Sequence, residues 1–317
     1  MKIVLSICIS ILCFFYILYS PLYAKEKYAF IKSKDLKQIN MVIKGFQKSY
    51  NNAEIRTLDL KGNKDYKLIE NFIAFNKPDL IICLGSLAAV TTVSIQKKIP
   101  IIFCLVINYQ KYDILKQQNV IGVSMEIPPA SLFTQFKFIM PSINSVGVAF
   151  NPKVSSEIIN EAFAALKKLN INLISMKVLE PDNIDIALKR NIDKYSALWM
   201  MADTKLYNRH TKALSKLISF SKKYKKPLMA FSEAFLKSGA LFTISIDYSS
   251  IGSQIALMSK RLIYDNISPQ QISIEPPIGT YTVINRPVAE LILGDKLDEA
   301  IYDLVDKVYP NDEADCD

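Results

Sequence analysis

The sequence predicts an α/β protein with two similar lobes, each built on a parallel β-sheet. Short apolar segments alternate with segments whose apolar residues recur every three or four positions, the pattern of strands separated by amphipathic helices. The strand segments are apolar throughout, which is typical of parallel strands covered by helices on both faces. The alternation restarts near residue 120, and the 317 residues suffice for two domains of ordinary size. The halves share this pattern without a close sequence repeat.

The first series of elements follows the N-terminal segment. Between residues 34 and 50, Leu36, Ile39, Val42, Ile43 and Phe46 form one apolar stripe, which predicts a helix with one buried face. The expected strands are 28–31, 55–58, 80–84 and 101–106, and the expected helices are 34–50, 65–76 and 86–97.

The second series begins with an expected strand at 120–124. Pro128 and Pro129 break this strand and open a helix, which Pro141 ends. The further expected strands are 146–150, 172–177, 197–201, 228–231 and 241–246, and the further expected helices are 155–169, 183–191, 205–222 and 251–264.

Charge and composition narrow the class of function. The net charge is +9, but the lysines are spread along the chain, and the densest cluster, KKYKK at 222–226, falls where a helix is expected to end. Nucleic-acid binding needs a concentrated basic patch with stacking aromatics, so we expect no nucleic-acid partner. One histidine and the absence of a CxxC pair argue against a metal site, and we expect no cofactor.

The first 24 residues have the pattern of a secretory signal peptide. Lys2 precedes an apolar stretch over 3–19, and Pro21 and Ala24 follow it. An uncleaved anchor helix is the alternative, but the apolar run is shorter than the roughly 20 residues that a membrane span needs. Lipid attachment at Cys13 is disfavoured because Leu12 stands where a small residue is expected. We expect cleavage after Ala24 and a periplasmic or other extracytoplasmic location.

Two further cysteines, Cys83 and Cys104, fall in expected buried strands. They are either free thiols in the core or, if their strands are neighbours with suitable geometry, a disulfide. The sequence leaves this choice open.

The stretch LGSLAAV at 84–90 places Ser86 where a strand ends and a helix begins. The G-x-S-x-G elbow of serine hydrolases is absent, and the single His210 falls on the charged face of an expected helix. Glycine-rich phosphate-binding motifs are absent as well. Ser86 therefore either caps the helix or, together with the N–H groups of Leu87 and Ala88, holds an anion such as a carboxylate.

Polar residues also follow most other expected strands. Each one taken alone is accounted for as a turn residue or a helix cap. Their recurrence at the carboxyl ends of strands, where open α/β sheets bind ligands, is typical of a ligand site. The candidates are Asn108 in the first lobe and Asn151, Asp203, Ser232, Glu233 and Asp247 after it.

Three stretches together resemble a known family. They are LGSLAAVTTVSIQKKIPIIF (84–103), NVIGVSMEIPPASLFTQFKFIMPSINSVGVAFNP (119–152) and SGALFTISIDYSSIGSQIALMSKRLI (238–263). Their order is similar to that of the periplasmic substrate-binding proteins of ABC transporters, in the tryptophan/tyrosine-type branch of the type 1 periplasmic binding fold. The resemblance covers about residues 28–293.

This resemblance implies two Rossmann-like lobes joined by a three-strand hinge, with the ligand between the lobes. Carried onto this chain, the crossings fall near 124–128, 246–250 and 279–285. Lobe 1 would comprise residues 25–124 plus 250–278, and lobe 2 would comprise 125–246 plus 280–317.

The resemblance also implies a function. A monomeric solute-binding protein would capture a small polar molecule, such as an amino acid or an aromatic compound, and deliver it unchanged to an ABC permease and its ATPase. The alternatives are a ligand sensor for a membrane signalling protein and an exported serine hydrolase. The family site maps onto Ser86 in lobe 1 and onto Asn151, Asp203, Ser232 and Glu233 in lobe 2, with Asp247 at the hinge.

For an amino-acid ligand, Ser86 would take the carboxylate, and Asp203, Glu233 or Asp247 would take the ammonium. Asp203 ranks first for direct contact, although it is also placed to cap a helix. The loop after the fourth strand departs from the Ser-Asp-Pro-like turn of many relatives. In this loop, Tyr109 and Tyr112 either stack on a planar ligand or cover the mouth of the cleft.

Overall fold

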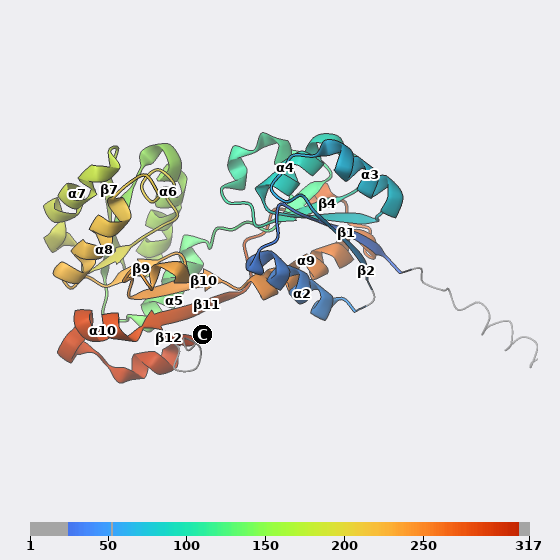
Figure 1. Cartoon of the computed structure of the whole chain (residues 1–317). Coiled ribbons are helices and arrows are strands. Elements are labelled where there is room, and N and C mark those ends of the chain that lie inside the picture. The colour runs from blue at the N-terminus through green and yellow to red at the C-terminus, as the bar shows by residue number, and fades with distance from the viewer. Residues whose placement is uncertain (1–24, 52, 311–317) are drawn as a thin grey trace, which may run out of the picture.

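The computed structural model describes residues 25–51 and 53–310, which fold into two α/β lobes joined by three chain segments (Figure 1). The expected signal peptide lies outside the described residues. No helix within the described ranges is long and apolar enough to cross a membrane.

Lobe 1 is a five-stranded parallel sheet between two helical layers. Its strand order is β2-β1-β3-β4-β5. The strands are β1 (Lys27–Lys32), β2 (Glu54–Asp59), β3 (Leu80–Leu84), β4 (Ile101–Cys104) and β5 (Val120–Gly122). The helices are α2 (Lys37–Ser49), α3 (Tyr66–Asn76) and α4 (Ser86–Ile95), together with α9 (Tyr248–Ile263) from late in the chain. Helices α2 and α9 cover one face of the sheet, and α3 and α4 cover the other.

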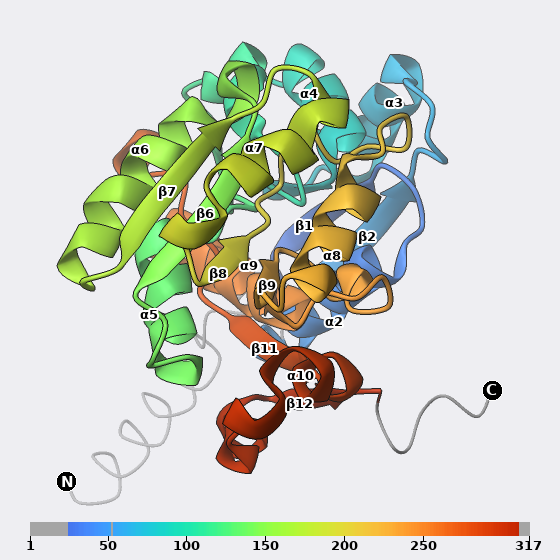
Figure 2. The same cartoon turned by 90° about the vertical axis from the view of Figure 1, so that its left-hand side faces the viewer.

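Lobe 2 has a seven-stranded sheet of order β12-β11-β10-β9-β8-β6-β7, in which only β11 runs antiparallel to its neighbour β10. The strands are β6 (Ser145–Phe150), β7 (Asn172–Lys177), β8 (Ala197–Trp199), β9 (Leu228–Ala230), β10 (Phe242–Ile246), β11 (Thr280–Asn285) and β12 (Lys307–Tyr309). The helices are α5 (Pro129–Ile139), α6 (Pro152–Lys168), α7 (Ile184–Arg190), α8 (Ala213–Lys223) and α10 (Arg286–Leu293). Helices α5, α6 and α10 cover one face, and α7 and α8 cover the other (Figure 2).

One expected helix is wrong at its start. The helix expected over 205–222 begins only at Ala213, as α8. In the preceding turns the Asp203 carboxylate accepts hydrogen bonds from the N–H groups of Lys205 and Leu206, both 3.0 Å long. Thr211 donates its hydroxyl to the carbonyl of Leu206. Side chains that bond nearby backbone compete with the helical ladder, so this stretch folds as turns.

The three crossings are tied to one another by backbone contacts. Val123, just before the first crossing, forms a bridge with Glu275, just before the third. The N–H of Asp247, in the second crossing, donates a 3.0 Å hydrogen bond to the carbonyl of Gly279. A Cβ on Gly279 would lie 2.3 Å from the Cβ of Ser250, so this close approach requires glycine. The three crossings therefore lie side by side and form one compact hinge.

The two strand cysteines do not pair. Both Cys83 and Cys104 are free and fully buried. In the β3–β4 register Cys104 lies opposite Leu84, one residue beyond Cys83. Successive residues of a strand point to opposite faces, so Cys83 joins the core under α3 and α4 and Cys104 joins the core under α2 and α9.

We predict that these thiols stay unreactive in the folded protein. Burial raises the pKa of the Cys83 thiol to about 12 and also raises that of Cys104. At pH 8 roughly one Cys83 thiol in ten thousand would then be the reactive thiolate. In a Cys316→Ser chain starting at Lys25, a thiol reagent should label neither residue until denaturant is added. Labelling of either thiol in the native protein at pH 8 would contradict the burial described here.

Helix α9 is fixed to lobe 1 by a close crossing with α2. A Cβ added to Gly252 would lie 2.1 Å from the carbonyl oxygen of Val42, and one added to Gly45 would lie 2.1 Å from that of Ser249. Beside this crossing, the hydroxyls of Ser49 and Ser253 are 2.8 Å apart. The two helix backbones therefore touch, which positions the chain that enters and leaves the hinge.

We predict that Gly252→Ala lowers the free energy of unfolding by about 1–3 kcal/mol, as overpacking does. The higher helix propensity of alanine would by itself raise the free energy of unfolding by about 1 kcal/mol. Urea unfolding would measure the difference, with Leu257→Ala, at an exposed position of the same helix, as the control. A stabilised Gly252→Ala protein would show that the helices are not in contact.

Candidate functional site

The carboxyl ends of both sheets lie beside the hinge. Strand β5 leads from its carboxyl end into the first crossing, and β10 leads from its carboxyl end into the second. Because parallel strands end at one edge, the loops of both lobes that follow their parallel strands are brought to the same region.

The start of α4 carries hydrogen-bond donors without protein partners. Gly85, at φ +95°, is the N-cap, so Ser86 is the first helical residue and does not cap it. The Ser33 hydroxyl, from the loop after β1, accepts a 3.0 Å hydrogen bond from the N–H of Ala88. Among the described residues, nothing accepts from the N–H of Ser86 or Leu87, and the Ser86 hydroxyl is unbonded. This edge of lobe 1 can therefore accept an anion at the positive end of a helix dipole.

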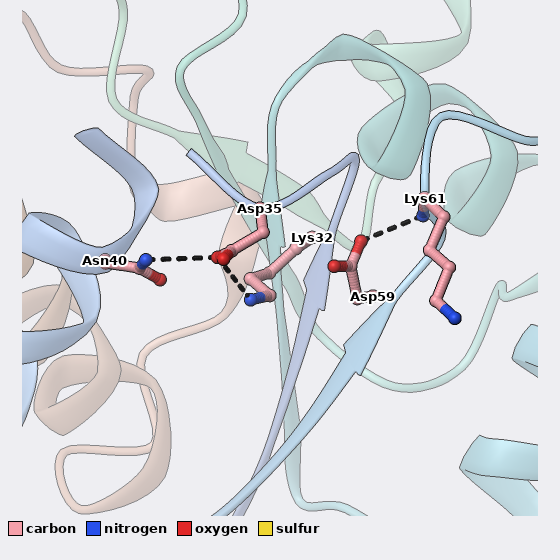
Figure 3. Close-up of polar contacts among 5 residues, drawn as sticks. All are labelled: Lys32, Asp35, Asn40, Asp59 and Lys61. Carbon is pink, nitrogen blue, oxygen red and sulfur yellow. Dashed lines mark hydrogen bonds and ion pairs between the residues drawn. The ribbon is translucent and has the colours of Figure 1, made fainter. Parts of the chain in front are cut away.

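The loop after β1 was missed as part of the site. Its polar run begins directly after an apolar strand, which is the signal used for the other loops. The Asp35 carboxylate accepts hydrogen bonds from Lys32 (2.9 Å) and Asn40 (3.0 Å), and both lower its pKa (Figure 3). Beside it, Asp59 accepts from the N–H of Lys61 at 2.8 Å. Because Lys32 already compensates it, Asp35 is poorly suited to binding a cationic guest.

The loop after β4 is tied to the first crossing. The N–H of Asn108 donates to Glu126 Oε1 over 2.9 Å, and the ring of Tyr109 lies 5.7 Å from that of Phe103. Burial and the carboxylates of Glu126 and Glu161 raise the pKa of Tyr109. Asn108 thus lies at the edge of lobe 1, with its backbone anchored to the hinge.

Asp203 has only 1% of its surface exposed, and all its hydrogen bonds lie within lobe 2. One oxygen accepts from the N–H of Asn151 (2.7 Å) and from the hydroxyl of Ser155 (2.8 Å). The other oxygen accepts from the N–H groups of Lys205 and Leu206. Four protein donors satisfy this carboxylate, which joins the β6–α6 junction to the loop after β8.

Asn151 is equally engaged in the fold. It is the N-cap of α6, accepting from the N–H of Lys153 at 3.1 Å, and its amide donates to the carbonyls of Val178 and Leu179. These bonds explain why α6 begins at Pro152 and not at the expected residue 155. Asn151 and Asp203 therefore lie together, but their polar groups are bonded to other groups of the protein.

Glu233 differs from Asp203. It follows β9 and is half-buried, and its Oε2 accepts one 2.8 Å hydrogen bond from the hydroxyl of Tyr281. Its Oε1 receives no bond from any described residue, and no lysine or arginine of the described chain pairs with it. The neighbouring Ser232, also half-buried, is the N-cap of the short helix that Glu233 begins. Tyr281 stands within strand β11, so the polar-residue signal at strand ends could not find it.

Asp247 lies in the second crossing, as expected for a hinge residue. It caps α9 by accepting from the N–H of Ser249 at 2.9 Å, and its other oxygen accepts from the hydroxyl of Ser250 at 2.5 Å. Both carboxylate oxygens therefore have protein donors. Of the three acidic candidates, Glu233 alone keeps an oxygen without one.

The arrangement is suited to binding, and Ser86 and the histidine belong to different lobes. Ser86 lies in lobe 1, whereas His210, the single histidine of the sequence, is exposed in the loop before α8 of lobe 2. No cluster of three or more metal-binding side chains occurs within residues 25–51 and 53–310. Donors on one lobe and a carboxylate on the other can hold a molecule that carries both charges.

Comparison with known proteins gives the family. The family model of ABC transporter substrate-binding proteins matches residues 31–308, which include both lobes and all three crossings. The chain belongs to the ABC transporter substrate-binding protein family. This family binds solutes and is a non-catalytic, extracytoplasmic class. The two-lobed type 1 fold with a three-strand hinge, predicted from the sequence, is confirmed.

Individual relatives are distant. A tyrosine-binding protein of Clostridioides difficile (strain R20291) is 24% identical over 184 residues, which are 56% of this chain and 52% of that protein. The chain thus spans about half the length of this curated relative.

Two solved structures show the same fold. The ligand-free, open structure of a substrate-binding protein with adhesive properties from Clostridium difficile has a TM-score of 0.67 at 16% identity, over 84% of this chain and 94% of that one. A domain from Streptococcus pneumonia in complex with L-Trp has a TM-score of 0.55 at 19% identity, over 89% and 99% of the two chains.

We predict different outcomes for the two acidic residues of lobe 2 in this substrate-binding protein. Asp203→Asn should lower the free energy of unfolding by about 2–4 kcal/mol, because an amide nitrogen would face buried donors. Glu233→Gln should change it by less than about 0.5 kcal/mol, as half-exposed substitutions usually do. Chemical denaturation would measure both. Equal stability of the two variants would contradict a structural role for Asp203.

Proposed function

We propose that this substrate-binding protein captures an amino acid with an aromatic side chain between its lobes and delivers it unchanged to an ABC permease. The observation that carries the proposal is that each lobe keeps an unsatisfied polar group at the carboxyl edge of its sheet. Lobe 1 offers the hydroxyl and N–H of Ser86 and the N–H of Leu87, and lobe 2 offers the free oxygen of Glu233. A zwitterion with one carboxylate and one ammonium group supplies a partner to each.

An aromatic side chain on the ligand is supported by the surroundings of Glu233. Phe231, at the carboxyl end of β9, is 38% exposed, and its ring lies 4.8 Å from that of Phe235. An exposed ring at the ligand-facing edge of a sheet gives a flat surface for a second ring. The tyrosine-binding relative and the L-Trp complex lend support from similar proteins.

Export and partners follow from the same proposal. The N-terminal 24 residues act as a signal peptide, the mature protein works as a monomer outside the cytoplasm, and an ABC permease with its ATPase receives the ligand. Closure of the lobes buries the ligand and excludes water, so each polar group of the ligand must find a partner in the protein. The ligand leaves chemically unchanged, in keeping with the non-catalytic family to which the chain belongs.

We predict that L-tyrosine or L-tryptophan stabilises the protein against heat. A ligand at a hundredfold excess over its Kd contributes about 2.7 kcal/mol to the free energy of unfolding. A thermal-shift screen of the amino acids would identify the ligand, and small-angle scattering should show a smaller radius of gyration with it. If none of the amino acids stabilises the protein, amino acids are rejected as its ligands. Capture of another class of solute would then need a new screen.

In the same assay Ser86→Ala should weaken binding of the identified amino acid by about tenfold, the equivalent of one hydrogen bond to a charged group. Ser94→Ala is the matched control, since Ser94 lies in the last turn of the same helix and donates to the carbonyl of Thr91. Calorimetric titration would give both affinities. If Ser86→Ala and Ser94→Ala lose the same binding affinity, Ser86 does not contact the ligand.

A further inference from the structure

The inference concerns Tyr281 and rests on the proposed function. Tyr281 is the second residue of β11, the strand into which the third crossing leads, and lies opposite Ser245 of β10. Its hydroxyl donates the 2.8 Å hydrogen bond to Glu233 Oε2. Two residues before it, the carbonyl of Gly279 accepts from the N–H of Asp247. Tyr281 thus connects the loop after β9 to the hinge.

The ring of Tyr281 is held in place from two sides. Lys307 of β12 places its Nζ 4.6 Å from the ring centroid, a cation–π contact. The ring also packs against the core cluster under α7 and α8. A half-buried ring with these contacts has few alternative rotamers, so its hydroxyl presents one fixed donor to Glu233.

The Tyr281 hydroxyl is a neutral donor, so it does not neutralise the Glu233 carboxylate. Burial and the Glu233 carboxylate both raise the pKa of Tyr281, so its hydroxyl stays protonated at neutral pH. A neutral donor orients the carboxylate without cancelling its negative charge. By contrast, Asp35 is paired with Lys32 and Glu275 is paired with Arg261 at 2.8 Å. Glu233 therefore keeps a free oxygen and forms no salt bridge among the described residues, since the nearby Lys307 contacts the ring of Tyr281 and not the carboxylate.

We propose that Tyr281 is a positioning residue that orients Glu233 toward the ammonium group of the ligand and so sets the preference for amines over their uncharged analogues. Tyr281 acts through Glu233 and does not itself contact the ligand. Loss of its hydroxyl frees the Glu233 side chain to rotate, and the ammonium group then loses a preorganised partner. The remainder of the ligand keeps its contacts.

The test compares two ligands that differ only in the amine. L-tyrosine and 3-(4-hydroxyphenyl)propionate would be titrated by calorimetry into the wild-type protein and into Tyr281→Phe, Glu233→Gln and Tyr302→Phe. Tyr302→Phe is the control, because its hydroxyl is buried without a partner among the described residues and its ring packs on the opposite face of the lobe 2 sheet from Tyr281. The ratio of the two dissociation constants is the readout, since a general loss of stability would change both constants alike.

We expect Tyr281→Phe to reduce the preference for L-tyrosine about tenfold and Glu233→Gln to reduce it further, with Tyr302→Phe at the wild-type ratio. An unchanged ratio in Tyr281→Phe overturns the inference while leaving capture of L-tyrosine intact. A wild-type protein that binds both ligands equally also overturns it.

A ligand-free measurement separates this inference from the proposed function. In protein labelled with ¹³C at tyrosine Cζ, Glu233→Gln should move the Cζ resonance of Tyr281 at neutral pH, because its hydroxyl then donates to a neutral amide instead of a carboxylate. If the wild-type protein binds neither ligand, the proposed amino-acid ligand fails, and this resonance still decides whether Tyr281 and Glu233 are coupled. An unmoved Tyr281 resonance overturns the coupling.

Discussion

The structure depends on one backbone contact, the hydrogen bond between the N–H of Asp247 and the carbonyl of Gly279. It joins the second and third crossings at the point where β10 ends and β11 begins, and Gly279 permits the approach because a side chain there would overlap Ser250. With the bridge between Val123 and Glu275, it gathers all three crossings into one place. Because the chain crosses there, the carboxyl edges of both sheets lie beside it, and each binding group described above lies on one of those edges.

A second constraint decides which polar groups remain for a ligand. A buried polar group must be paired, and a group that the protein has already paired has little left to offer. Asp203, with four donors, serves the fold, while Glu233, with one neutral donor, keeps an oxygen and a charge. On lobe 1, Ser33 takes the N–H of Ala88 and leaves those of Ser86 and Leu87. Local satisfaction of hydrogen bonds thus distinguishes structural from binding residues of the same chemical type.

The sequence predicted the architecture well because hydrophobic periodicity is local. Apolar runs such as Leu80–Leu84 became central strands, and the stripe from Ile39 to Phe46 became the buried face of α2. Such local signals could not show which of Asp203, Glu233 and Asp247 is free to contact a ligand. Two of the four donors to Asp203 come from Asn151 and Ser155, about fifty residues earlier, and Tyr281 reaches Glu233 from a strand 48 residues later. The late start of α8 reflects side-chain bonds from Asp203 and Thr211, which periodicity does not report.

The placement of Cys83 and Cys104 on opposite faces of the lobe 1 sheet bears on how the protein matures. Two sulfur atoms on adjacent strands, separated by the sheet itself, give oxidising enzymes no cross-link to form in this core. Lobe 1 can therefore reach its final structure equally well in an oxidising or a reducing compartment, without help from disulfide isomerases. Its described core is held by close packing and hydrogen bonds without a disulfide, which makes recombinant production in a reducing cytosol a faithful route to the native lobe.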